Sequence, residues 1–563
     1  MRKKREKTEL KKETFLSTAK SFGLDIHDPH IEELYTYVQK ILPILKRVEE
    51  LDVNDLEPMW PLIPSHQDKP QQTPSQRGKD QRVKARKTSH KNDELYYLSA
   101  GQLSRLIKKK EVSPVEVVEA HLSRIEALEP KLNSFITLLP DRAMAEARRA
   151  EKEIQAGRYL GPLHGIPFGL KDLFYVKGVR NTSGSKIFDH FSPHFDSTIA
   201  RRLKEAGAIL LGKLNLHPFA YGITGENEEY GHMHNPWNPS LIAGGSSGGS
   251  GSAVASGECT LAMGTDTGGS IRVPCALCGL VGLKPTYGRL SRYGVTSLAW
   301  SQDHPGPMTR TVEDCALMMD AVAGYDPGDP SSLNLQLPDY TQALRGDIKG
   351  LRLGVLKEFF EVPIEPQVKE SVCKAIDTLG GLGAIVSEVS WPIYHDAMAI
   401  ASVIQMVEAT AYYEKLLKAN ASRIYPPARL RLEAGIFIQA TDYVQAQRAR
   451  TLFYRQSCDL FKKVDILAGP TVPVTAFPIG TPKVKIGKRN VNLVSLMSQY
   501  TRPFNLNGFP AITVPCGFSK DRLPIGLQLV GRPFDEESVL RIAHIYEQST
   551  EWHRQRPPVT DDE

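Results

Sequence analysis

Cysteine is scarce in this sequence and follows no pattern that would tie the chain together. Seven cysteines are spread over 563 residues, an odd number at low density. Small secreted domains that rely on disulfides carry many more cysteines for their length. The sequence therefore excludes a disulfide scaffold and favours a reducing environment.

Long apolar runs are also missing. No stretch of eighteen consecutive apolar residues occurs, so we expect no transmembrane helix. Residues 1–15 (MRKKREKTELKKETF) have the positive charge of a secretory signal but lack the apolar segment that must follow it. Together with the few cysteines, these absences predict a soluble, cytoplasmic protein that does not bind a membrane.

A positive surface charge is absent from most of the chain. The formal net charge is +6, but residues 1–15 hold seven Lys or Arg against three Glu, and residues 65–92 hold eight against two Asp. The rest of the chain is therefore slightly acidic. Because a nucleic-acid-binding body normally carries a basic patch, we do not expect nucleic acid as a partner.

Composition and periodicity divide the chain into three segments. Residues 1–64 contain helical periodicity, and residues 65–92 are polar and basic, with too few apolar residues to order themselves. We expect a small helical unit at 1–64, a disordered or extended linker at 65–92 and one large domain at 93–563.

The helical unit is predicted from its apolar spacing. From Ile31 to Leu51 the apolar residues recur at the interval of one helix face. Asp28 and Pro29 precede this stripe and suit a helix start, and a shorter apolar set around Phe15 predicts an earlier helix. Such a small unit needs a neighbour on which its stripe can pack.

The large segment alternates short apolar runs with helical patterns. Strand-like runs such as GIPFGL, AILLGKL, LRLGVL, DILAGP and AITVPCGF are separated by amphipathic stretches such as DSTIARRLKEAG. Strands interleaved with helices predict an α/β fold with a largely buried sheet.

The run GGSSGGSG at 244–251 allows two interpretations. Gly and Ser are typical of flexible spacers, but core-forming sequence follows directly (SAVASGECTLAMGTDTGGSIRVPCALCGLVGL). The run formally matches the nucleophile elbow G-x-S-x-G, yet Pro and Asn precede it instead of a strand, and the Lys of a phosphate-binding loop is missing. Two Ser-bearing glycine loops joined by a helix-like segment indicate a site built from backbone amides.

These motifs resemble the amidase signature family from about residue 93 to the C-terminus. The matching stretches are GIPFGLKDLF, AGGSSGGSGSAVASG, GTDTGGSIRVP, GLKPTYGRLSRYGV, FPAITVPCGF and LPIGLQLVGRP. The resemblance implies a single large α/β domain with a mixed, twisted central sheet covered by helices. It also implies a Ser-Ser-Lys triad, with Lys171 as base, Ser246 as bridging serine after a cis peptide bond, and Ser270 as nucleophile.

The chemistry of these residue types agrees with that implication. A serine hydroxyl attacks well only when a neighbour takes its proton, and Ser-Lys pairs are a known solution. Lys171 must be neutral for this, so its pKa must fall from about 10.4 towards 7, at about 4 kcal/mol. Burial at the end of a strand can supply that shift, while strand alternation should turn the adjacent Asp172 to the other face.

Several neighbours of the triad are candidates for supporting roles. We expect the backbone amides of Thr267, Gly268, Gly269 and Ser270 to form an oxyanion hole. Asp266 and Arg272 are interpreted mainly as an ion pair that holds this loop, with substrate contact as the alternative.

Other chemically suggestive pairs carry less weight. Asp303 and His304 either orient substrate or cap a turn. Cys275 and Cys278 form a CxxC without a second pair, so packing is favoured over zinc. His232 and His234 are interpreted as loop residues. We expect no metal and no cofactor.

The predicted function is hydrolysis of the C–N bond of a small linear amide through an acyl-enzyme, releasing ammonia or an amine. Whether the substrate is an amide, urea-like compound, carbamate or aryl amide is left open. The presence of all three triad residues argues against an inactive scaffold.

A second hypothesis comes from the N-terminal segment. The stretch HIEELYTYVQKILPILKRVEELDVNDLEP resembles the small C subunit of aminoacyl-tRNA amidotransferase. The alternative is therefore a glutaminase A-type subunit that works on Glu-tRNA(Gln) or Asp-tRNA(Asn) with a separate B subunit. Such A-type subunits carry Gln where this chain has Val273 and His304, so we favour the stand-alone hydrolase. A homodimer stays open, as does packing of the N-terminal unit on its own or a neighbouring catalytic domain.

Overall fold

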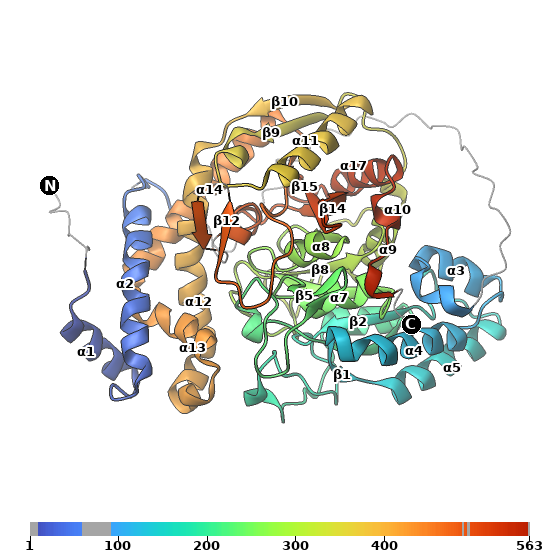
Figure 1. Cartoon of the computed structure of the whole chain (residues 1–563), viewed down its shortest axis with the longest axis horizontal. Helices are drawn as coiled ribbons and strands as arrows, with labels where there is room; N and C mark the ends of the chain where they lie inside the picture. Colours follow the sequence, from blue (N-terminus) through green and yellow to red (C-terminus); the bar gives the residue numbers. More distant parts are fainter. Residues whose placement is uncertain (1–8, 54, 59–91, 487–488, 493–495, 561–563) are drawn as a thin grey trace.

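The computed structural model describes residues 9–53, 55–58, 92–486, 489–492 and 496–560. Within these residues the centre of the molecule is a mixed sheet of eleven strands (Figure 1). In order across the sheet they are β1 (Phe135–Leu138), β3 (Ile209–Leu214), β2 (Pro167–Lys171), β6 (Leu261–Asp266), β8 (His304–Thr309), β7 (Val281–Lys284), β14 (Ala511–Phe518), β15 (Pro524–Val530), β11 (Ile466–Pro470), β9 (Arg352–Leu356) and β10 (Ile385–Val389). The predicted α/β fold with a mixed central sheet is confirmed.

The catalytic motifs lie on the central strands of this sheet. β2 runs parallel to β3 and β6, whereas β8 pairs antiparallel with β6 and with β7. β2 and β3 are buried along their whole length, as expected for strands with a parallel neighbour. β2 contains the PFGL part of the predicted run GIPFGL, and β3 contains the ILLGKL part of AILLGKL. The strand ends of β2 and β6 therefore carry the two motifs towards each other.

Helices cover both faces of the sheet, as the alternation along β15 shows. Leu527 and Leu529 belong to the large hydrophobic core that also contains Val539 of α17. Gln528, between them, instead accepts a hydrogen bond from Arg272 of α8 at 2.8 Å. The helices that surround the sheet are α3 (Ala100–Lys108), α4 (Pro114–Leu132), α5 (Pro140–Gln155), α6 (Thr198–Glu205), α7 (Gly248–Ser256), α8 (Arg272–Cys278), α9 (Val312–Val322), α10 (Tyr340–Ala343), α11 (Pro366–Gly381), α16 (Pro503–Leu506) and α17 (Glu536–Gln548).

Two short hairpins stand outside the main sheet. They are β4 (His234–Asn235) with β5 (Asn238–Ile242), and β12 (Lys483–Ile486) with β13 (Arg489–Asn492). An isolated bridge from Leu241 to Pro478 joins the first hairpin to the segment before the second.

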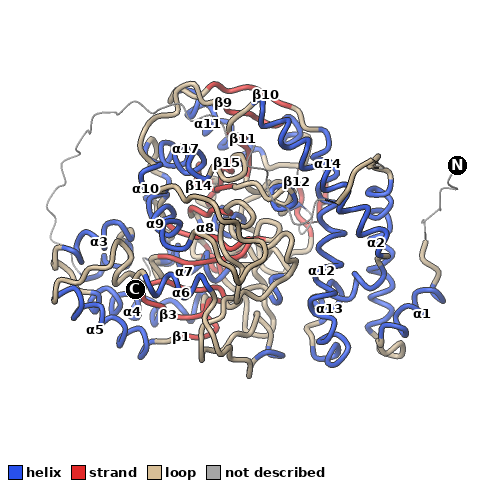
Figure 2. The backbone as a smooth tube through the Cα atoms, turned by 180° about the vertical axis from the view of Figure 1, so that it is seen from behind, coloured by secondary structure: helices blue, strands red, loops and turns tan. Residues whose placement is uncertain are grey.

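A second body of helices packs beside the sheet, and Figures 1 and 2 both show the N-terminal helices on its outer side. It comprises α1 (Lys12–Phe22), α2 (His30–Glu49), α12 (Ala397–Asn420), α13 (Pro426–Glu433) and α14 (Ala440–Lys463). The predicted stripe of α2 is buried here, in a cluster with residues of α12 and α14. No helix in the described part of the chain is long and apolar enough to cross a membrane.

Polar contacts fix the N-terminal helices to their own chain. Arg429 donates to the Asp28 carboxylate at 2.7 Å, and His30 Nε2 lies 2.9 Å from Glu433 Oε2. The N-terminal unit thus packs on the α12–α14 body of the same chain. The predicted linker at 65–92 lies outside the described residues except for Asn92, and the three-segment division stays a prediction.

Candidate active site

Lys171 is the last residue of β2 and is completely buried. Its Nζ lies 2.7 Å from the Ser246 hydroxyl and 2.8 Å from the Thr265 hydroxyl. Burial lowers the pKa of Lys171 from 10.5 to about 7, although the charges of Asp266 and Asp303 act to raise it. A neutral amine in contact with a serine hydroxyl can accept that serine's proton.

Asp172 does not reverse the lowering of the Lys171 pKa, because its side chain points to the other side of the strand. Its carboxylate forms an ion pair with Lys213 at 2.5 Å, and both side chains are fully buried. Thr182 donates to the same carboxylate from its backbone amide and its hydroxyl. The strand alternation expected at this position is present, and none of the described carboxylates contacts Lys171 directly.

Ser246 lies in the loop that leads into α7. The Gly245–Ser246 peptide bond is cis, as the resemblance implies. The loop is held by backbone hydrogen bonds, from Gly245 N to Ile223 O at 2.7 Å and from His217 N to Ser246 O at 3.0 Å. A side chain at Gly245 would come within 2.6 Å of the Gly225 nitrogen. The glycine run is therefore a closely packed structural loop, and the spacer interpretation is wrong.

Ser270 lies in the loop between β6 and α8 and is almost fully buried. Its backbone carbonyl accepts a hydrogen bond from Ser247 N at 3.3 Å, which brings the two serine loops together. The Ser246 and Ser270 hydroxyls make no hydrogen bond to each other among the described residues. The structure thus shows the Lys171–Ser246 contact directly and places Ser270 on the adjoining loop.

Asp266 organises the nucleophile loop. Its carboxylate accepts from the amides of Gly269 (2.7 Å) and Ile271 (3.1 Å), and it forms a buried ion pair with Arg272 at 2.9 Å. Burial acts to raise the pKa of Asp266, but the charge and hydrogen bonds of Arg272 lower it overall. Arg272 also donates to Asn505 at 2.7 Å. These contacts are those expected if Asp266 and Arg272 hold the loop, the role favoured from the sequence, which stays a prediction.

The expected oxyanion hole needs one correction. The amide of Gly269 donates to Asp266 and is therefore committed to holding the loop. The amides of Gly268 and Ser270 make no hydrogen bond within the described residues. The Gly269 amide therefore leaves the predicted set of four donors, and an oxyanion hole formed by Thr267, Gly268 and Ser270 stays a prediction.

His304 does not contact the triad. Its Nδ1 lies 2.6 Å from the carbonyl oxygen of Gln302, and its ring packs edge-on against Tyr287. Burial lowers the pKa of His304 well below its usual value, so the imidazole is neutral. The role that the structure supports for His304 is packing behind Asp266.

Asp303 holds the turn that follows the nucleophile loop. Its carboxylate accepts from the hydroxyl of Thr267 at 2.6 Å, the hydroxyl of Ser297 at 2.6 Å and the amide of Leu298 at 3.0 Å. Of the two roles considered for Asp303, the turn cap is present, and through Thr267 it is linked to the active-site loop.

The remaining pairs are structural. Cys275 and Cys278 are buried, and their thiols contact the backbone carbonyls of Val281 and Ala243. In the described part of the chain, no group of three or more His, Cys, Asp or Glu is arranged to hold a metal ion. His232 lies in a loop, where its Nδ1 accepts from the Asn227 amide. The loop prediction is wrong for His234, which begins strand β4 and contacts the carbonyl of Pro239 in β5, because the two strands pair as a hairpin.

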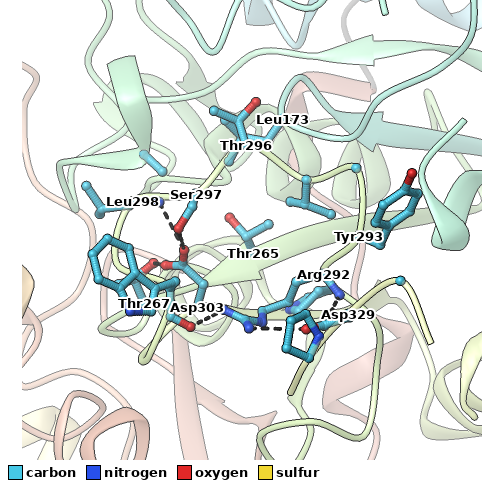
Figure 3. A pocket seen from close by; sticks show the side chains of 17 residues that line it. Leu173, Thr265, Thr267, Arg292, Tyr293, Thr296, Ser297, Leu298, Asp303 and Asp329 are labelled. Atoms are coloured by element: carbon cyan, nitrogen blue, oxygen red, sulfur yellow. Dashed lines mark hydrogen bonds and ion pairs between the residues drawn. The ribbon is translucent and has the colours of Figure 1, made fainter. Parts of the chain in front are cut away.

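A cavity of about 270 Å³ reaches the site from one side (Figure 3). Thr265 and Thr267 line it, together with Asp303 and an ion pair between Arg292 and Asp329. Leu173, two residues after Lys171, forms another part of its wall. The cavity gives a small molecule room beside the lysine and the nucleophile loop.

Sequence reasoning missed Thr265, His217 and Arg502. Thr265 supplies the second hydroxyl on Lys171, and His217 is buried with its backbone bound to Ser246. Arg502 lies beside Gly268 although it is far away in the sequence. Strand alternation along β6 places Thr265 and Asp266 on opposite faces, and this pattern could have indicated a separate role for Thr265. No local sequence pattern predicts that Arg502 lies here.

The comparisons with known proteins agree with this geometry. The Amidase family model matches residues 116–540. The A subunit of glutamyl-tRNA(Gln) amidotransferase from Chloroflexus aurantiacus is 43% identical over 488 residues, covering 82% of this chain and 99% of that protein. Its counterpart from Geobacter metallireducens is 44% identical over the same length and coverage.

Solved structures show the same fold. A chain from an inhibitor-bound vestigial protein complex, which reveals the evolutionary origins of an s-triazine catabolic enzyme, has a TM-score of 0.78 and 36% identity, covering 80% of this chain and 98% of that chain. The glutamyl-tRNA(Gln) amidotransferase A subunit of Thermotoga maritima has a TM-score of 0.69 and 33% identity, covering 81% and 95%. With its family motifs in place and its lysine against a serine hydroxyl, this chain belongs to the amidase family.

Proposed function

We propose that this protein hydrolyses a carboxamide C–N bond through an acyl-enzyme on Ser270. The Ser270 hydroxyl gives its proton to Ser246, whose own proton passes to Lys171 Nζ, and the Ser270 oxygen bonds to the carbonyl carbon. The C–N bond then breaks as the proton returns through Ser246 to the leaving nitrogen. Water next attacks the ester in the same way and releases a carboxylic acid. The 2.7 Å contact between Lys171 and Ser246 is the observation that carries this proposal.

The loop amides support the charge that forms during attack. The tetrahedral intermediate carries a negative oxygen, and preorganised N–H donors stabilise it by about 3 to 4 kcal/mol per donor. Gly268 and Ser270 provide such donors on a loop that Asp266 holds in place. For Ser270 to pass its proton on, its hydroxyl must come within hydrogen-bond distance of the Ser246 hydroxyl.

For the biological substrate we propose L-glutamine, with this chain acting as the A-type subunit of a tRNA-dependent amidotransferase. The high identity to amidotransferase A subunits over 99% of their length supports this choice over the stand-alone hydrolase expected from the sequence. In that role the released ammonia serves a separate B subunit that binds the aminoacyl-tRNA. The N-terminal unit, which resembles a C subunit, then braces the catalytic domain of its own chain.

One observation favours a second candidate, a stand-alone hydrolase of another amide. Val273 and His304 stand where A-type subunits carry Gln. Val273 packs in an apolar cluster with Trp237 and Leu277, and His304 is buried against Tyr287, so neither position offers the amide group expected of a glutaminase subunit.

Ammonia release distinguishes the two candidates. The purified chain is assayed with L-glutamine alone and then with Glu-tRNA(Gln) and an amidotransferase B subunit. The amidotransferase role predicts glutamine hydrolysis that rises when both are added and is lost in Ser270→Ala. Rapid hydrolysis of simple amides with no response to tRNA or B subunit favours the second candidate. Full activity in Ser270→Ala overturns the mechanism for both.

A further inference from the structure

Arg502 lies directly against the nucleophile loop. The hydroxyl of its neighbour Thr501 donates to the Gly268 carbonyl at 2.7 Å, which seats this segment on the loop. A Cβ added at Gly268 would lie 3.0 Å from Arg502 Nε and 3.2 Å from its Nη2. The Nε–Nη2 edge of the guanidinium therefore faces the loop two residues before Ser270.

That edge of Arg502 has no partner among the described residues. Nε is buried without a hydrogen bond, and the side chain donates only through Nη1, to the Ser402 hydroxyl at 3.1 Å. Arg502 forms no ion pair with any described carboxylate. Arg272, in contrast, pairs with Asp266 on the other side of the same loop. Because an unpaired buried charge is unfavourable, Arg502 has the chemistry of a binding group.

The surroundings of Arg502 add positive charge rather than cancel it. Burial lowers the pKa of Arg502, and its titratable neighbours are Tyr221, Tyr37 and Arg431. Arg431 donates to the Tyr221 carbonyl and lies over its ring. No carboxylate is among these neighbours in the described part of the chain.

The charge of Arg431 also acts next to the bridging serine. Burial lowers the pKa of His217, and the charges of Arg431 and Lys171 lower it further. His217 is bound through its amide to Ser246, so the positive charge of Arg431 acts close to the catalytic loop. An anionic group next to the scissile amide would balance the positive charge of the arginines, whereas a neutral substrate would leave it unbalanced.

We propose that the Nε–Nη2 edge of Arg502, supported by Arg431, binds a carboxylate on the amide substrate. The proposal rests on the proposed hydrolysis and narrows its substrates to amides that carry a carboxylate a few bonds from the scissile carbonyl. A planar guanidinium edge matches the two oxygens of a carboxylate. Arg502 as a whole is partly exposed, although its Nε is buried. Tyr37 of α2 is near enough to interact electrostatically with Arg502, which brings the N-terminal unit close to this subsite.

The test compares two amides that differ in the carboxylate, succinamate and butyramide, together with L-glutamine. We expect the parent chain to prefer succinamate. Arg502→Gln should lower kcat/KM for succinamate about 10- to 100-fold, mainly through KM, as a lost hydrogen bond to a charged group does. The loss for butyramide should be much smaller, and Arg502→Lys should recover part of the preference.

Arg142→Gln is the matched control, because Arg142 lies on α5 and pairs with Glu146 four residues later. It should leave the preference unchanged, and thermal melting checks that each variant is folded. Equal losses for both amides in Arg502→Gln, or no preference in the parent chain, overturn the proposal.

Binding provides an independent readout if neither amide turns over. Calorimetry with Ser270→Ala should show saturable binding of succinamate but weaker binding of butyramide, and adding Arg502→Gln should remove the difference. Absence of succinamate binding to Ser270→Ala also overturns the subsite. Failure of the hydrolytic mechanism is separate, since it shows as ammonia release that survives Ser270→Ala while the carboxylate preference persists.

Discussion

The buried lysine makes a quantitative prediction for the pH dependence of catalysis. Burial lowers the pKa of Lys171 from 10.5 to about 7, a change that corresponds to about 5 kcal/mol. At pH 7 about half of the molecules then hold a neutral amine, against roughly 0.03% for an unshifted lysine. The environment of Lys171 thus supplies about a thousandfold more of the active base at neutral pH.

The assay is the pH profile of kcat/KM between pH 5.5 and 9 for an amide that the enzyme hydrolyses. The neutral base predominates above the pKa, so activity should rise tenfold per pH unit below 7, reach half its maximum near pH 7 and stay level above pH 8. A profile that is flat from pH 6 to 9, or that is still rising steeply at pH 9, would refute the reasoning.

A charge variant tests the cause of the shift. The charge of Asp303 raises the pKa of Lys171, so Asp303→Asn should move the midpoint of the profile to lower pH. The matched control is Asp442→Asn, at the start of the distant helix α14, which should leave the midpoint unchanged. A midpoint that moves upward in Asp303→Asn would contradict the electrostatic account.

Three further predictions concern the relay, the loop packing and a buried acid pair. Ser246→Ala should lower kcat by about 10²- to 10⁴-fold with little change in KM, measured by ammonia release; a KM effect alone would contradict the relay. Gly249→Ala should lower the free energy of unfolding by about 1–3 kcal/mol or more in urea titrations, because its Cβ would meet the Ser134 carbonyl at 2.4 Å. Gly381→Ala, in open space on α11, should instead be neutral or stabilising, and equal effects would contradict the packing argument. Burial raises the pKa of both Glu129 and Glu258, so the folded state disfavours their ionisation. The unfolded chain ionises first as the pH rises above about 4.5, and the free energy of unfolding therefore falls until the pH passes the raised pKa values. The difference in melting temperature between Glu258→Gln and the parent should therefore be more positive at pH 8 than at pH 5. The same difference at both pH values would contradict the raised pKa values.

Local sequence patterns were enough to predict the elements that carry the motifs. The apolar spacing from Ile31 to Leu51 became α2 (His30–Glu49), because burial of one stripe decides helix formation. The runs GIPFGL and AILLGKL became β2 and β3. Lys171 and Ser246, assigned through the family resemblance, lie in direct contact.

The parts that could not be predicted depend on contacts between distant segments. The amide of Gly269 is taken by Asp266 because of the particular turn of the loop, which no spacing rule specifies. Strand alternation predicts the face to which Asp172 points, but not its ion-pair partner Lys213 on the neighbouring strand β3. Arg502 reaches Gly268 from the far end of the chain, and only the folded sheet brings them together.

The most direct test of the central claim is to find which residue carries the acyl group during turnover. The enzyme is quenched with acid while it hydrolyses an amide, digested and analysed by peptide mass spectrometry. The account predicts the substrate's acyl group on Ser270, and its loss together with activity in Ser270→Ala. An acyl group on Ser246 or another residue, or undiminished hydrolysis by Ser270→Ala, would contradict it.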